Sequence, residues 1–93
     1  MQFTIEFECR PGMTDYYYQI ADEMVRIFDI SASEAAGRIN QMWHGRKFLT
    51  EADELMLYHD DPDRWANVIY YGPGSRWWLK EDGLAPQPYQ GPR

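Results

Sequence analysis

The sequence feature that most constrains the fold is one short segment in the second half of the chain. It begins with an aspartate-rich run and ends with a run of glycine and proline. Residues 60–63 read Asp-Asp-Pro-Asp, which supplies a capping carboxylate, a proline suited to the first helical position and an acid at the positive end of the helix dipole. The Gly-Pro-Gly run at residues 72–74 then breaks the segment. Because apolar residues recur at helical spacing from Trp65 onward, the sequence predicts a helix over residues 62–71.

Two earlier segments show the same spacing. Apolar residues from Tyr17 to Phe28 fall on one helical face, which predicts a helix over residues 15–28. Ser31 and Glu34 then form a capping-box pattern at the start of a second helix, over residues 32–43. The short turn between the two indicates a helical hairpin.

Three other stretches favour strands. Apolar and polar residues alternate over residues 2–9, which is typical of a half-buried strand. The continuous apolar run at residues 55–58 predicts a buried strand over 54–59, although a short helix also fits it and would make the protein mainly helical. Alternation around Trp77 predicts a third strand, over residues 75–80.

These elements define an α+β fold. We expect a small three-stranded, mostly antiparallel sheet with the helical hairpin on one face and a short third helix, in a single domain over residues 1–81. Residues 82–93 are rich in proline, glycine and glutamine and predict a loosely ordered tail. The strand order and the oligomeric state are left open.

A chain of 93 residues with one cysteine cannot form an intramolecular disulfide. It has no signal-peptide pattern and no apolar run near the roughly 18 residues that a membrane span needs. We therefore expect a cytoplasmic protein that does not enter a membrane. Cys9 lies on the apolar side of the first predicted strand, so we interpret it as a small buried hydrophobe and not as a nucleophile.

The sequence lacks the motifs of common catalytic chemistry. It has no phosphate-cradling glycine loop, no cysteine or histidine spacing for a metal and no serine-nucleophile motif. His59 precedes two aspartates, but neighbouring residues on an extended chain point to opposite sides and make a poor ligand set. The sequence predicts a non-enzymatic protein with no cofactor and no metal.

Charge and aromatic content indicate a protein partner. The net charge is −6, and residues 50–64 hold six acidic residues against one arginine. Such a surface repels phosphate backbones and anionic lipid and attracts basic partners. Tyrosine and tryptophan are frequent interface anchors, with Tyr16 and Tyr18 as further candidates. The predicted partner-binding residues are Glu51, Asp53, Glu54, Asp60, Asp61, Asp63, Tyr70, Tyr71 and Trp77.

One segment of the chain resembles a pattern in small stand-alone bacterial proteins of unknown function. The matching residues cover about a quarter of the chain and are Tyr58-His59-Asp60-Asp61-Pro62, Trp65-Ala66, Ile69-Tyr70-Tyr71-Gly72 and Trp77-Trp78. In size and charge only, the protein is also similar to immunity proteins that block bacterial toxins. The matched pattern implies no activity by itself. From the acidic charge and the aromatic residues, and by analogy with immunity proteins, we expect an immunity or inhibitor protein that sequesters a basic toxin or effector domain.

Two alternatives involve nucleic acid. The helical hairpin allows a helix-turn-helix regulator that uses residues 32–47, with Arg38, Asn40, Gln41 and Arg46 as groove contacts. Its turn lacks the usual glycine, and the net charge opposes DNA binding, so a nucleic-acid partner is disfavoured. The other alternative is an inhibitor whose carboxylates mimic nucleic acid.

Overall fold

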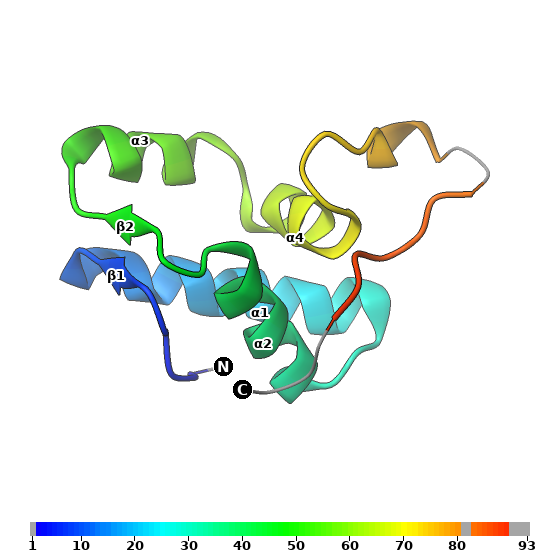
Figure 1. The fold of residues 1–93 in the computed structure, drawn as a ribbon, viewed down its shortest axis with the longest axis horizontal. Coiled ribbons are helices and arrows are strands. Elements are labelled where there is room, and N and C mark those ends of the chain that lie inside the picture. Colours follow the sequence, from blue (N-terminus) through cyan, green and yellow to red (C-terminus); the bar gives the residue numbers. More distant parts are fainter. Residues whose placement is uncertain (1, 81–82, 90–93) are drawn as a thin grey trace.

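The computed structural model describes residues 2–80 and 83–89, and within these ranges the chain is mostly helical (Figure 1). The elements in chain order are β1 (Glu8–Cys9), the 3-10 turn η1 (Pro11–Met13), α1 (Thr14–Phe28), α2 (Ala32–Met42), β2 (Lys47–Phe48), α3 (Glu51–His59), α4 (Pro62–Tyr71) and the 3-10 turn η2 (Trp77–Leu79). The helices predicted over residues 15–28, 32–43 and 62–71 are confirmed as α1, α2 and α4, with each end within one residue.

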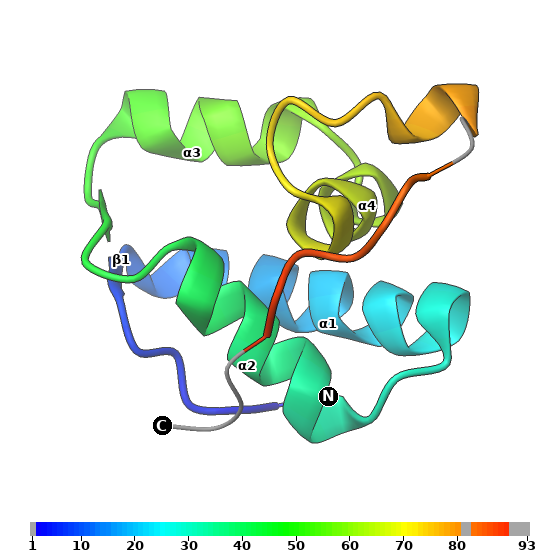
Figure 2. The same ribbon diagram turned by 45° about the vertical axis from the view of Figure 1, so that its right-hand side comes forward.

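Helix α1 is the centre of the fold. It packs most extensively against α4 and α2, and Figure 2 shows it lying beneath α4 with α2 crossing in front of it. Its inward face buries Tyr17, Ile20, Ala21 and Met24 completely, as the helical spacing predicted. The helix ends where Asp29 adopts a left-handed conformation and its N–H donates to the carbonyl of Val25.

The core contains a cluster of four aromatic rings from different parts of the chain. The rings of Phe7, Tyr17, Trp43 and Phe48 contact one another pairwise, with centroids 5.0 to 5.8 Å apart and mostly in edge-to-face geometry. Such geometry adds about 0.5–1.5 kcal/mol per pair beyond the area buried. The cluster joins the N-terminal segment to α1, the end of α2 and β2.

The predicted three-stranded, mostly antiparallel sheet is wrong. Among the described residues the only strands are β1 and β2, which pair in parallel with Glu8 opposite Lys47 and Cys9 opposite Phe48. The α+β assignment is therefore corrected to a mainly helical fold. The strand predicted over residues 2–9 is present only at 8–9: residues 2–6 have no regular secondary structure and Phe7 lies in a bend, although burial alternates over residues 2–7 as expected.

A side chain of α2 takes the place of a strand partner along residues 4–6. The N–H of Glu6 donates to Asn40 Oδ1 over 2.8 Å, and Asn40 Nδ2 donates to the carbonyl of Thr4 over 2.9 Å. The side-chain amide of Asn40 thus accepts one hydrogen bond from the N-terminal segment and donates another to it, as the backbone of a neighbouring strand would. The alternation correctly predicted the pattern of burial, but it does not specify which groups form hydrogen bonds with the backbone, and the predicted strand is limited to residues 8–9.

The strand predicted over residues 54–59 is also wrong, because this stretch is helix α3. Thr50 and Asp53 form a complete capping box that starts the helix. Leu57 is the only fully buried residue of α3, so the apolar run does not reflect burial on both sides. The alternative of a short helix at this run is confirmed.

The strand predicted over residues 75–80 is replaced by the single turn η2. The N–H groups of Leu79 and Lys80 donate to the carbonyls three residues earlier, at Arg76 and Trp77. The segment thus satisfies part of its backbone locally and joins no ladder. The predicted tail over residues 82–93 is described only at 83–89, and its remaining residues lie outside the described part.

Candidate partner-binding surface

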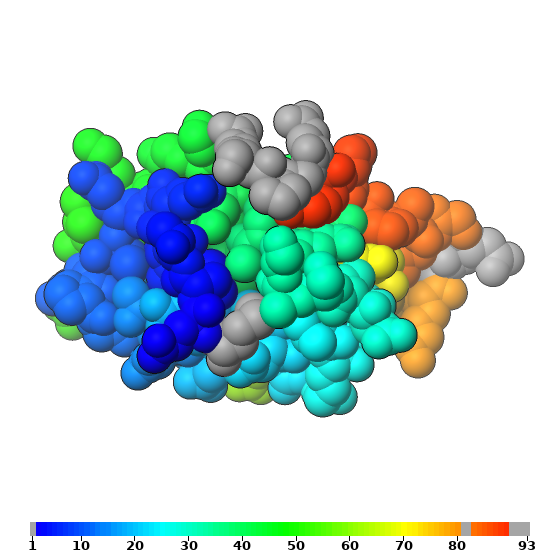
Figure 3. All heavy atoms as spheres, turned by 90° about the horizontal axis from the view of Figure 1, so that it is seen from below, coloured from blue at the N-terminus to red at the C-terminus, as the bar shows by residue number. Residues whose placement is uncertain are grey.

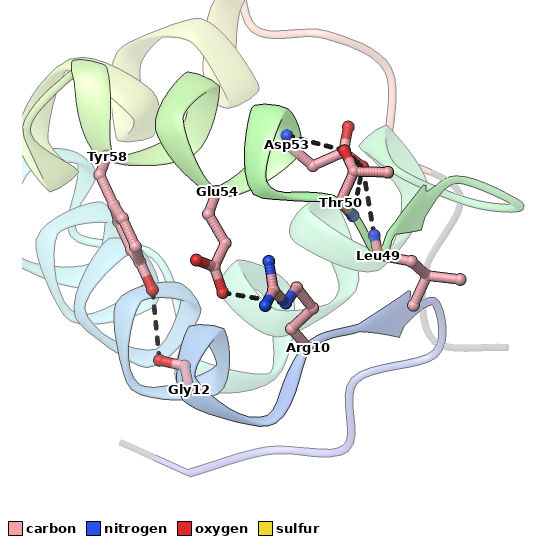
Figure 4. Close-up of polar contacts among 7 residues, drawn as sticks. All are labelled: Arg10, Gly12, Leu49, Thr50, Asp53, Glu54 and Tyr58. Carbon is pink, nitrogen blue, oxygen red and sulfur yellow. Dashed lines mark hydrogen bonds and ion pairs between the residues drawn. The ribbon is translucent and has the colours of Figure 1, made fainter.

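The acidic residues at the start of α3 are partly used within the molecule (Figure 4). Asp53 Oδ2 accepts hydrogen bonds from the N–H groups of Leu49 and Thr50, each over 3.1 Å, and from the Thr50 hydroxyl over 2.8 Å. The bonds from Thr50 lower the pKa of the Asp53 carboxyl. Glu54 forms an ion pair with Arg10 at 3.4 Å, whereas Glu51 is exposed.

The second acidic group lies at the start of α4. Asp60 Oδ1 lies 3.4 Å from Arg64 Nε, and its backbone carbonyl accepts the hydroxyl of Tyr16. Burial, followed by the carboxylates of Asp61 and Asp60, raises the pKa of Tyr16. The side chains of Asp61 and Asp63 are exposed, so this end of α4 presents carboxylates to solvent.

Arg64 connects this acidic group to a pair of tryptophans. Its guanidinium lies 5.9 Å from the centroid of the Trp77 ring, and the rings of Trp77 and Trp78 meet edge to face at 5.7 Å. The same arginine forms the ion pair with Asp60. The predicted acids of α4 and the predicted anchor Trp77 therefore belong to one continuous surface.

Beside the tryptophans lies an open depression of about 600 Å³, which we call the aromatic groove. It lies where α1 ends, along α4 and beneath η2 (Figure 1). Trp78 in its lining is 56% exposed, and Leu79, the next residue along the chain, is 50% exposed. The residues of its lining that matter here are Ile27, Phe28, Asn67, Tyr71, Trp77 and Trp78.

The structure brings Tyr71 and Trp77 together in this groove and separates Tyr70 from it. Tyr70 is half-buried, stacks on Phe28 with centroids 3.8 Å apart and lies under the guanidinium of Arg38. Sequence reasoning omitted Phe28 and Trp78 from the site. Trp78 directly follows the predicted anchor Trp77 in the sequence, which is a signal that could have identified it, whereas nothing distinguishes Phe28 from an ordinary core residue.

The two further tyrosine candidates pack against other parts of the chain. Tyr16 is half-buried and meets Tyr58 edge to face at 5.0 Å, while the ring of Tyr18 meets Phe3 at 5.3 Å. Neither lines the aromatic groove.

The four residues considered for DNA contact all bond within the chain. Arg38 is only 7% exposed and pairs with Glu34 at 2.7 Å, and Asn40 is buried against the N-terminal segment. Gln41 donates to the carbonyl of Pro88 over 2.8 Å. The guanidinium of Arg46 lies 4.8 Å from the ring centroid of Phe48.

Three further observations concern chemistry and membranes. Over residues 2–80 and 83–89, no three His, Cys, Asp or Glu side chains gather as a metal would require. Burial raises the pKa of the Cys9 thiol, which lowers its thiolate fraction. No helix in the same ranges has both the length and the apolar character needed to cross a bilayer.

Comparison with known proteins finds no family model, no curated protein and no solved structure that matches this chain.

Proposed function

We propose that this protein is a non-enzymatic binding module that sequesters a basic protein in the cytoplasm, in the manner of an immunity or inhibitor protein. The observation that carries the proposal is the aromatic groove, with Trp78 exposed in its lining, the exposed Leu79 next to it in the chain and the acidic start of α4 beside it. Exposed aromatic side chains around a depression are the usual anchors of protein interfaces.

Acids and aromatics have different tasks in this proposal. A net charge of −6 attracts a basic partner over long range and raises the association rate, an effect that salt screens. The tryptophans and Tyr71 bury apolar area once contact is made, and so they set the dissociation rate. Asp61 and Asp63 are the acids best placed for both tasks, because they are exposed and close to Arg64 and Trp77.

The proposal is tested by affinity capture from a bacterial lysate with three immobilised proteins: the natural chain, Trp78→Ser and Leu55→Ser. Leu55 is the matched control, because it is 65% exposed and lies on α3, away from the aromatic groove. We expect a basic protein that the natural chain and Leu55→Ser both retain and that Trp78→Ser loses. Its association rate, measured with the purified pair, should fall as salt rises.

Charge variants separate the two tasks. Asp61→Asn with Asp63→Asn should slow association and weaken its salt dependence, whereas the exposed Glu51→Gln at the far end of α3 should change the rate less. Capture of the same proteins by Trp78→Ser and by the natural chain would contradict the proposal. A salt-insensitive association would contradict the role of the acids.

A further inference from the structure

The C-terminal segment of residues 84–89 crosses the surface between α4 and α2, and we call the surface beneath it the tail groove (Figure 2). Gln87 is held at three points. Its N–H donates to the carbonyl of Tyr70 over 2.7 Å, its side-chain amide donates to the carbonyl of Tyr71 over 3.2 Å, and its own carbonyl accepts Arg38 Nη1 over 2.8 Å. The next carbonyl, of Pro88, accepts the side-chain amide of Gln41.

Two glycines make room for the segment. A methyl group built on Gly37 would overlap the Tyr89 hydroxyl and lie 2.8 Å from its ring carbon Cε1. A methyl group on Gly72 would overlap the side-chain amide of Gln87. The guanidinium of Arg38 lies over the Tyr89 ring, 5.3 Å from its centroid. The tail groove therefore has a slot for a tyrosine and a slot for a glutamine, two residues apart.

Gly37 is unfavourable for the helix that contains it. Glycine in the interior of a helix costs about 0.5–1 kcal/mol relative to alanine, and α2 is otherwise rich in alanine. Burial of the charged Arg38 guanidinium also costs free energy unless the group is paired. Its partners are Glu34 and the carbonyl of Gln87. Both features are explained by an occupied tail groove.

The body of the protein closes its core without the segment. No residue of 83–89 belongs to the buried core, whose last member along the chain is Ile69. Residues 85–88 are exposed even though they are docked, and only Leu84 and Tyr89 are half-buried. Figure 3 shows the segment, in red, lying on the outside of the molecule next to α2. It contacts the body as a bound peptide contacts a protein surface.

We propose that the tail groove is a peptide-binding site that recognises an extended Gln-Pro-Tyr segment, and that the chain's own tail occupies it in cis. Hydrogen bonds at Gln87 and Pro88 hold the backbone of the bound segment. The slot at Gly72 accommodates the glutamine side chain, and the slot at Gly37 accommodates the tyrosine side chain. This site adjoins the aromatic groove, because Leu84 lines that groove and Tyr71 contributes to both, but it does not depend on the function proposed above.

Because the chain's own tail occupies the tail groove, it lowers the apparent affinity of the groove for a separate peptide. A tail joined by a short connection acts at an effective concentration in the millimolar range, so the same sequence in trans must compete with it. Releasing the tail should therefore open the site.

The test uses the full chain with Gln87→Ala and Tyr89→Ala, which leaves the body unchanged and removes both recognised side chains. The probe is a synthetic peptide with the sequence of residues 83–89, titrated while amide NMR shifts are followed. We expect saturable shifts at Gly37, Arg38 and Tyr71 in this variant. The natural chain should need roughly tenfold more peptide or higher for the same response, because its own tail competes.

Two controls make the result specific to the slots. Adding Gly37→Ala to the tail variant should abolish peptide binding, since the new methyl group fills the tyrosine slot, while it raises the helical propensity of α2 and so keeps the protein folded. A peptide of the same composition in reversed order should not bind.

The proposal is overturned if the tail variant shows no shifts at α2 and α4 up to millimolar peptide. It is equally overturned if the reversed peptide or the Gly37→Ala background gives the same binding curve. The amide spectrum of each variant reports in the same experiment whether the body is folded.

Discussion

At the scale of single residues, the hydroxyl of Tyr17 is anomalous. The side chain is completely buried in the aromatic cluster, and within the described part of the chain the hydroxyl oxygen has no hydrogen-bond partner. Burial is the main cause that raises the pKa of Tyr17 far above its usual value. An unpaired buried hydroxyl opposes folding, because it gives up its bonds to water without replacement.

We predict that Tyr17→Phe keeps or raises the free energy of unfolding at pH 7, by about 0–1 kcal/mol. The folded protein also retains the Tyr17 proton more tightly than the unfolded chain does. The natural protein therefore keeps its full stability below the usual tyrosine pKa of about 10 and loses stability as pH rises above it. Tyr17→Phe should lose less stability in that alkaline range. Denaturant unfolding between pH 7 and 11 measures both effects.

The control for this variant is Phe48→Ala, which empties space in the same cluster and should cost about 3–5 kcal/mol. A loss of more than 1 kcal/mol in Tyr17→Phe would mean that the hydroxyl is bonded, for example to a buried water.

Asn40 is the second residue whose role is clear only in three dimensions. Its amide both accepts from Glu6 and donates to Thr4, so Asn40→Ala should cost about 1–3 kcal/mol and release the N-terminal segment. The amide hydrogen of Glu6 should then exchange much faster. Asn40→Asp keeps the acceptor for Glu6, but it loses the donor to Thr4 and places a carboxylate in a buried site, so it should also destabilise the protein. Unchanged protection of Glu6 in Asn40→Ala would contradict this role.

At the scale of elements, the helices were predictable and the strands were not. Apolar spacing, a serine cap and a proline start are local signals, and they identified α1, α2 and α4 within one residue. The run at residues 55–58 is too short for its period to separate strand from helix. The capping box before it was the better signal, since a cap acts on the helix that directly follows.

Helix α3 should depend on that cap more than the other helices do. It packs less extensively than they do, and it is held to the body by Leu57, the Arg10–Glu54 pair and the Tyr58 hydroxyl bond to Gly12 (Figure 4). We predict that Asp53→Ala lowers the melting temperature and accelerates amide exchange in α3. Glu51→Ala, which changes an acid in the same turn, should alter neither.

The same cap predicts a pH dependence. The folded protein holds the Asp53 pKa below its usual value, so the contribution of this carboxylate is present at neutral pH and is lost as pH falls through the acidic range. The stability difference between the natural protein and Asp53→Ala should therefore shrink on acidification. A difference that stays constant down to pH 2 would contradict the assignment of the cap.

The candidate sites were predictable only in part, for a related reason. Composition and charge predicted Tyr71, Trp77 and the acidic residues at the start of α4 as partner-binding residues. These residues contribute to the surface around the aromatic groove. The tail groove depends on contacts between residues about fifty positions apart, such as Gly37 and Tyr89. A glycine within an alanine-rich helix signals close approach by something, but the sequence does not say by what.

At the scale of the whole molecule, α1, α2 and α4 enclose one core, and among the described residues after Ile69 none is a buried member of it, although Tyr70 packs against it. The tail contributes a few hydrogen bonds at the surface and loses the conformational freedom of its own residues, and these two terms largely cancel. The molecule should therefore fold without its tail.

We predict that a chain ending at Lys80 unfolds cooperatively and is less stable than the natural chain by under about 2 kcal/mol. Methyl shifts of Ile20, Ile39 and Ile69 report the core, and they should match those of the natural protein. Shifts should change near Gly37, Arg38, Gln41, Tyr70 and Tyr71, which the tail contacts, and in the part of the aromatic groove that Leu84 lines. If the shortened chain is unfolded, the tail is an integral part of the fold, and its description as a replaceable ligand is wrong. If it is folded, its open groove offers a second protein on which to repeat the peptide titration.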